Sequence, residues 1–155
     1  MKRRTNVLPV FLLLLLTAAC IHKSGGAVTP WERVTTYNAA LAQANNTLEQ
    51  GAEAISTSGL ATPAQVAPLI GTTGTVATIH LQVTAILQQG TATAANIASI
   101  KALIDQMNAS ISAIPVTTLG IKNPKSQQSF AADLKSISTM ADAVLASLEA
   151  IHGVK

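Results

Sequence analysis

Four long segments of the chain carry apolar side chains every three or four positions, a spacing typical of helices with one apolar face. Each such line of positions, which we call a seam, is bordered by polar and small residues, so no predicted helix is apolar all round. The predicted seams are, in chain order, Val34, Tyr37, Leu41, Ala44, Leu48 and Ile55; Val66, Leu69, Thr73, Val76, His80, Val83 and Leu87; Ile97, Ile100, Ile104, Met107, Ile111 and Ile114; and Phe130, Leu134, Ile137, Ala141, Val144, Leu148 and Ile151.

Residues typical of helix ends set the bounds of the first two helices. The first is expected to begin at Thr29-Pro30, with Glu32 completing a capping box, and to end at Gly59. The same start signal, Thr-Pro-Ala-Gln, returns at 62–65. Thr62 follows Gly59 by only three positions. A connection this short makes the second helix the antiparallel neighbour of the first.

The second helix, expected to end at Gly90, contains three residues that weaken a helix, Pro68, Gly71 and Gly74. Proline removes a backbone donor, and each glycine costs up to about 1 kcal/mol relative to alanine. We therefore expect a kink or frayed first turns. A strand over 75–83 is the alternative, because this stretch is rich in β-branched residues, although the chain shows no second strand to pair with it.

The third helix is expected over about 92–114, ending at Pro115, and a loop over 116–122 is long enough to cross one end of a bundle. Asn123-Pro124 then opens the fourth helix as cap and first residue, and Gly153 closes it.

Four helices with one apolar face each bury those faces by packing against one another. The sequence therefore predicts an all-α fold, an antiparallel four-helix bundle formed by one domain over 29–155. At about 1.5 Å per residue, the bundle would be a rod roughly 35 to 45 Å long.

The start of the chain has the order of a secretory signal. Lys2, Arg3 and Arg4 precede an uncharged run over 5–21. Its strongly apolar part, 7–19, has about 13 residues, whereas a helix that spans a bilayer needs roughly 20. This segment therefore reads as an export signal and not as a permanent span.

Thr17, Ala18 and Ala19 lead directly into Cys20, the single cysteine of the chain. This stretch resembles the lipobox of bacterial lipoproteins, and the resemblance covers the first twenty residues. It implies that residues 1–19 are a signal peptide that is removed, that Cys20 is lipidated, and that 20–28 is the lipidated cysteine and a short flexible tether. Ile21 in place of aspartate implies the outer membrane, if the cell has one.

An ordinary cleaved signal is the alternative, because Thr17-Ala18-Ala19 also suits a general signal peptidase and would leave Cys20 as a free thiol. An odd cysteine in an exported protein needs a partner or a use, and acylation provides one.

Three of the ten basic residues lie in the signal, so the seven basic residues of the mature part balance its seven acids. The mature protein is therefore close to neutral, and the sequence predicts no binding of nucleic acid.

The sequence contains no catalytic motif, and we expect no enzyme activity, no catalytic residues, no metal site and no cofactor. His22, His80 and His152 have no metal-ligand spacing. His80 lies on a predicted seam, either as a half-buried structural histidine or as an internal ligand. Glu49 and Glu53, one turn apart, form either a weak cation site or two exposed acids.

The sequence favours a non-enzymatic, lipid-anchored helical-bundle protein of the bacterial cell envelope, with a structural or partner-binding role. Such a protein would be extracytoplasmic and held on the membrane by the lipid on Cys20. A carrier that binds an apolar small molecule or cofactor inside the bundle near His80 is the alternative. A further possibility is a protein partner or homo-oligomer, with the seams of the third and fourth helices forming a coiled-coil interface.

Overall fold

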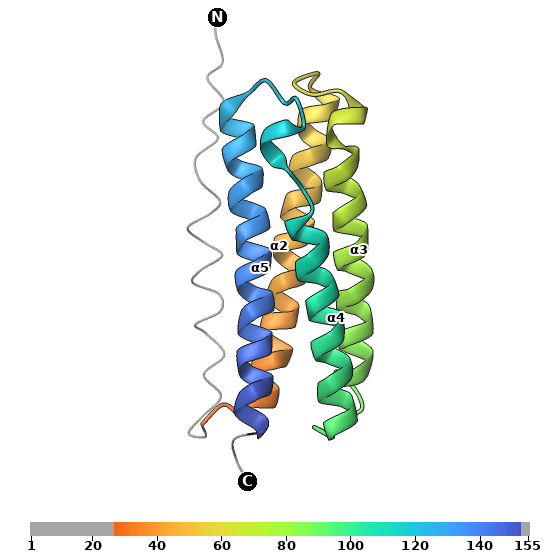
Figure 1. The fold of residues 1–155 in the computed structure, drawn as a ribbon, viewed down its shortest axis with the longest axis vertical. Coiled ribbons are helices and arrows are strands. Elements are labelled where there is room, and N and C mark those ends of the chain that lie inside the picture. The colour runs from red at the N-terminus through yellow and green to blue at the C-terminus, as the bar shows by residue number, and fades with distance from the viewer. Residues whose placement is uncertain (1–26, 153–155) are drawn as a thin grey trace, which may run out of the picture.

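A computed structural model describes residues 27–152 of the chain, which form a four-helix bundle (Figure 1). The signal over 1–19, Cys20, most of the tether and Gly153 lie outside these residues. The predicted all-α fold is confirmed, and the strand alternative over 75–83 is wrong because this stretch is helical. The elements are α2 (Pro30–Thr57), α3 (Pro63–Leu87), α4 (Ala94–Ser112), the short 3₁₀ helix η1 (Val116–Thr118) and α5 (Pro124–His152).

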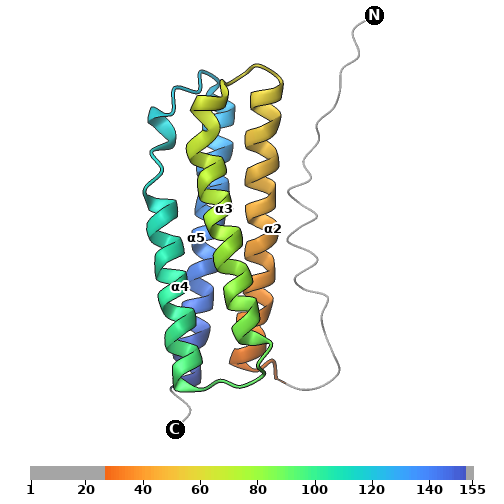
Figure 2. The same ribbon diagram turned by 90° about the vertical axis from the view of Figure 1, so that its right-hand side faces the viewer.

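The four helices run alternately up and down (Figures 1 and 2). Each helix packs against its neighbours in the chain, and the first and last helices, α2 and α5, also pack against each other. The diagonal pairs α2–α4 and α3–α5 make no backbone contact within the described part. The helices therefore form a ring of four around one shared core, as short connections between antiparallel neighbours dictate.

The predicted starts of the first two helices are confirmed. The Glu32 N–H donates to Thr29 Oγ1 at 3.2 Å, and the Thr29 N–H donates to Glu32 Oε2 at 2.8 Å, which completes the capping box. At the start of α3, the Thr62 N–H donates to Gln65 Oε1 at 2.8 Å. Gly59 follows α2 with a φ of +72°, in the left-handed region that glycine adopts without strain.

The second half of the chain follows the prediction with two differences. α4 begins at Ala94, because Thr93 Oγ1 accepts from the Asn96 N–H at 3.2 Å and caps the helix there. The predicted open loop after Pro115 contains η1, and Val116 and Ile121 within it are buried. This connection therefore closes one end of the core with its own apolar side chains.

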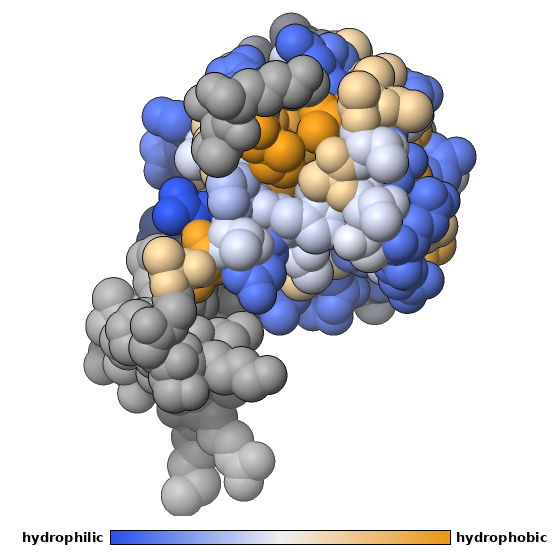
Figure 3. Space-filling view, turned by 90° about the horizontal axis from the view of Figure 1, so that it is seen from below, coloured by the Kyte–Doolittle hydropathy of each residue, from blue (hydrophilic) through white to orange (hydrophobic). Residues whose placement is uncertain are grey.

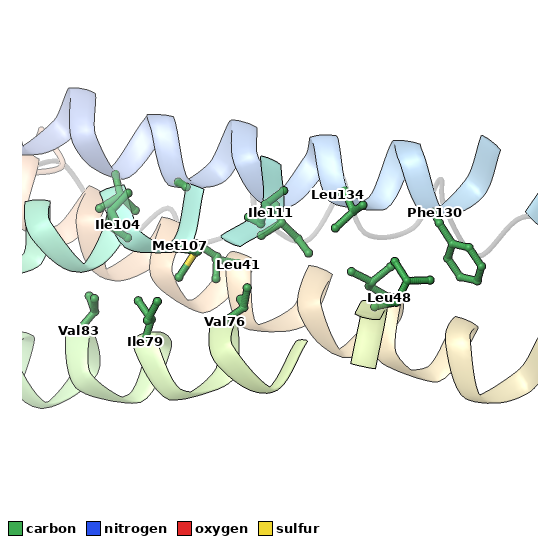
Figure 4. Packing of buried hydrophobic residues seen from close by; sticks show 14 of the residues in the cluster. Leu41, Leu48, Val76, Ile79, Val83, Ile104, Met107, Ile111, Phe130 and Leu134 are labelled. Atoms are coloured by element: carbon green, nitrogen blue, oxygen red, sulfur yellow. The ribbon is translucent and has the colours of Figure 1, made fainter. Parts of the chain in front are cut away.

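The core lies between the four helices, with side chains from all of them directed inward (Figure 4). Gly51 of α2 lies so close to α5 that a Cβ added there would be 3.3 Å from Phe130 Cε1. The fully buried large side chains include Val34, Leu41, Leu48, Val66, Leu69, Ile79, Ile100, Ile104, Met107, Ile121, Ile137 and Leu148.

Two predicted seams needed correction. Tyr37 is 37 % exposed and Ala44 is half-buried, whereas Asn38 and Asn45, one position further on, are buried. In α3 the core position belongs to Ile79, and His80 is half-buried at the edge. A helix in a ring of four contacts a neighbour on each flank, so its buried face is wider than a single seam.

The second helix is continuous from Pro63 through Pro68, so the expected frayed first turns are not found. Among the described helices, α3 is long and apolar enough to cross a membrane by length and composition, a test that a core helix of a bundle also meets. The chain carries no Asp, Glu, Lys or Arg from 54 to 100, a stretch that includes all of α3. α3 and the connections on either side of it therefore carry none of these four residue types.

Candidate binding groove between α2 and α3

Two asparagines of α2 point into the interface with α3. Asn38 is 2 % exposed and Asn45 is 4 % exposed, and they are seven residues apart. Together with the buried Val34, Leu41 and Leu48 they complete a spacing of four and three along α2. They therefore occupy core positions of the kind at which a polar residue fixes the pairing of two helices.

The orientation of the Asn38 side chain is fixed by its neighbours. The Thr84 hydroxyl donates to the His80 carbonyl oxygen at 2.8 Å, so Thr84 Oγ1 can act toward Asn38 only as an acceptor. Asn38 Nδ2 donates to it at 2.9 Å, with the His80 carbonyl oxygen at 3.5 Å. The amide nitrogen therefore faces α3, and Asn38 Oδ1 is left buried with no partner among residues 27–152.

Asn45 makes a similar contact one heptad further along. Its Nδ2 donates to the Thr73 carbonyl oxygen at 3.0 Å, and the Thr73 hydroxyl donates to the Ile70 carbonyl oxygen at 2.8 Å. Asn45 Oδ1 is likewise buried without a partner in the described structure. Both amides thus tie α2 to α3 through one half of the side chain and leave the other half unsatisfied.

A groove of about 340 Å³ lies over the first of these two contacts. His80 is one of the residues that line it, and its ring Nδ1 is buried without a hydrogen-bond partner among the described residues. None of the described residues that line the groove is Asp, Glu, Lys or Arg. They are Thr35, Asn38 and Ala39 from α2, with His80, Thr84, Leu87 and Gln88 from α3.

A second groove, of about 220 Å³, lies between the start of α4 and the end of α5. It belongs to the end of the bundle shown in Figure 3, where apolar residues are visible near the middle of the surface. Its lining is mainly apolar, with one basic and one acidic residue: Ala94, Ile97, Ala98, Lys101, Leu145, Leu148 and Glu149.

The remaining candidate residues are not brought together. Glu53 is exposed and Glu49 half-buried, and the described residues contain no group of three or more side chains suited to a metal ion. Asp133 of α5 is 6 % exposed, and burial raises the pKa of its carboxyl above the ordinary value of 3.8. His22 lies outside the described residues, and His152 ends α5.

The two asparagines were the residues that sequence reasoning missed. The signal that could have found them is the same four-and-three spacing that identified the leucines, applied without the requirement that every position be apolar.

No family model, no curated protein and no solved structure matches this chain.

Proposed function

We propose that this protein is a non-enzymatic, lipid-anchored helical-bundle protein of the bacterial cell envelope with a structural or partner-binding role. The observation that carries the proposal is the position of Cys20, the one cysteine in the sequence, directly after a secretory signal and three small residues. The proposed location is extracytoplasmic, on the outer membrane if the cell has one.

The arrangement of the bundle suits a protein tethered at one end. α2 begins and α5 ends at the same end of the rod (Figure 1). The tether over 20–28 can span at most about 30 Å when fully extended. That end would therefore stay near the lipid, while the connections over 58–62 and 113–123 would face away from it.

Burial in the bundle argues against a coiled-coil partner that binds through the seams of the third and fourth helices. The seams of α4 and α5 lie inside the bundle, with Ile100, Ile104 and Ile137 fully buried. A coiled-coil partner that used these seams would have to open the bundle. A partner would instead bind the outer surfaces of the helices or the end connections.

The test of the anchor compares the full wild-type chain with Cys20→Ala, expressed in a bacterium, by detergent partition and intact mass. We expect wild type to be cut before Cys20, to carry acyl chains and to enter the detergent phase. We expect Cys20→Ala to lack the acyl mass. An unmodified wild-type chain that stays in the aqueous phase would overturn the anchor and leave a free exported binding domain.

A second candidate function, the carriage of a small molecule near His80, is favoured by the groove between α2 and α3. Leu41, Ile79 and Val83 are buried in the core between the helices (Figure 4). A ligand would therefore bind in the groove at the helix edge and not inside the core.

A further inference from the structure

We infer that the tethered end of the bundle rests on the membrane surface, with Val28 and Trp31 in contact with lipid. This is the end at which α2 begins and α5 ends (Figure 1). The inference deepens the proposed function, because it rests on the lipid anchor at Cys20 and names the contact that the anchor brings about.

The two ends of the bundle are closed differently. At the far end, the connection between α4 and α5 buries Val116 and Ile121 against the core. At the tethered end, every residue of the connection between α3 and α4, over 88–93, is exposed. This second connection adds no buried side chain, so it does not extend the core as the first one does.

Apolar side chains reach the surface at the tethered end. Val28, just before α2, is 45 % exposed. Trp31 is half-buried in the first turn of α2, and its ring leans toward this end because helical side chains tilt toward the start of their helix. The groove of about 220 Å³ between α4 and α5 lies at the same end and has a mainly apolar lining. Figure 3 shows apolar residues near the middle of this surface.

The length of the tether makes the membrane the occupant of this surface. The lipid would be joined to Cys20, and the tether over 20–28 spans at most about 30 Å. The bilayer is therefore always within reach of this end, at a high effective concentration, whereas a free partner must be captured from solution. Even a weak apolar contact with the bilayer would then be populated.

The chemistry of the tethered end suits an uncharged contact with lipid. Tryptophan favours the membrane–water interface, where its ring meets apolar chains and its N–H group meets water. The exposed charged residues of the first turn of α2 and of the nearby groove balance one another: Glu32, Arg33, Lys101 and Glu149. The contact therefore depends on apolar side chains and not on attraction to anionic lipid.

Trp31 is the one tryptophan in the sequence, so tryptophan emission reports this position alone. The experiment reconstitutes the full chain, as the bacterium processes it, into vesicles of phosphatidylethanolamine and phosphatidylglycerol. Part of the phospholipid is brominated along its acyl chains, because bromine quenches tryptophan only at short range. We expect the brominated lipid to quench Trp31, and about 0.5 M salt to leave the quenching unchanged, because salt screens only charge interactions.

A second chain, with Trp31→Phe and Leu60→Trp, moves the tryptophan to the far end as a control. Leu60 is 50 % exposed in the connection after α2, and the 28 residues of α2 place it about 40 Å from Trp31. We expect the brominated lipid to leave the emission of this chain unchanged.

Val28→Asp and Leu60→Asp form the matched pair of variants. Each replaces an exposed apolar side chain by a carboxylate, at opposite ends of the bundle. A carboxylate at the lipid surface loses water without gaining a partner, so we expect Val28→Asp to lower the quenching of Trp31 about twofold or more. We expect Leu60→Asp to leave it unchanged. Circular dichroism checks that both variants remain helical.

Flotation of the protein with the vesicles tests the anchor separately from the contact. Flotation together with quenching of Trp31 that Val28→Asp lowers supports the inference. Flotation without quenching overturns the inference and leaves the anchor standing. Equal quenching in the Leu60→Trp chain also overturns it, because the bundle would then lie along the membrane. A protein that does not float overturns both proposals. If Val28→Asp does not fold, the comparison of Trp31 with the Leu60→Trp chain decides the question alone.

Discussion

The α2–α3 and α4–α5 interfaces place their polar side chains differently. Between α2 and α3, Asn38 and Asn45 are buried in the core, and each leaves its amide oxygen without a partner in the described structure. Between α4 and α5 the polar contacts lie at the half-exposed edge. There Asn108 Nδ2 donates to Asp142 Oδ1 at 3.1 Å, and Asn108 Oδ1 accepts from the Ser138 hydroxyl at 3.3 Å.

The comparison separates stability from specificity. The isoleucine seam of α4 is apolar and needs only to fill space, and many apolar sequences would do so. A buried amide contributes less to stability, but its N–H group finds an acceptor only when α2 and α3 pair in one register. The α2–α3 interface is therefore the more specific of the two, and it is the one that buries hydrogen-bonding atoms without a partner in the described structure.

The largest effect is expected in the apolar interface. Ile104 of α4 is fully buried, and Ile104→Ala removes its contacts and leaves a cavity. We expect a loss of about 2–5 kcal/mol in the free energy of unfolding, measured by urea denaturation. Ser99→Ala, at an exposed position of the same helix, is the control and should change it by about 0.5 kcal/mol or less. A loss below about 1 kcal/mol for Ile104→Ala would show that α4 packs loosely.

A smaller effect is expected in the polar interface. Asn45→Ala removes the hydrogen bond to the Thr73 carbonyl oxygen, and we expect a loss of about 1–2 kcal/mol in the same urea experiment. Ser138→Ala, at the half-exposed edge of α4–α5, should cost about 0.5 kcal/mol or less. Equal costs for the two variants would remove the distinction drawn between the interfaces.

A gain in stability is expected on the outer face of α3. A Cβ added at Gly71 meets no atom within 4 Å, so Gly71→Ala should raise the free energy of unfolding by about 0.5–1 kcal/mol through helix propensity. At Gly51 the added Cβ would be 3.3 Å from Phe130 Cε1, so Gly51→Ala should gain less or lose stability. If both alanine variants were equally stabilising, the close approach of α2 to α5 would be in doubt.

The last prediction concerns pH and the α5 side of the bundle. Burial raises the folded-state pKa of Asp133 above 3.8, so the folded protein holds this proton more tightly than the unfolded chain does. Stability is then highest below the unfolded pKa and falls as the pH rises through the raised, folded pKa. Thermal unfolding of wild type and Asp133→Asn between about pH 3 and about pH 8 measures this contribution.

Asp133→Asn should match wild type at the acid end of this range and exceed it at neutral pH, because the amide remains uncharged. A variant that is less stable than wild type at neutral pH would mean that the ionised carboxyl has a favourable partner in solution.

The helix bounds could be predicted from the sequence because capping is local. The boxes at Thr29 and Thr62 and the turn at Gly59 depend on residues within a few positions of one another. The spacing of apolar residues along the sequence likewise predicted the bundle.

The groove could not be predicted in the same way, because its contacts join residues more than forty positions apart. Asn38 is buried only because Thr84 and the His80 carbonyl oxygen accept its amide protons across the interface. A ranking by hydrophobicity placed Tyr37 in the core instead. His80 was placed on the predicted seam, with a half-buried structural histidine as one reading, and it is half-buried, whereas Ile79 beside it holds the core position because α3 faces a neighbour on either flank.

The uncharged stretch has a practical consequence for digestion of the protein. Trypsin cleaves after lysine and arginine, and the chain has neither between Arg33 and Lys101. Even the unfolded chain would release nearly all of α2, and all of α3, as one fragment over 34–101. Apart from the cut after Arg33 in the first turn of α2, a tryptic map therefore reports opening only in α4, α5 and the connection between them. A protease that cuts after apolar residues is needed to follow the rest of the α2–α3 pair.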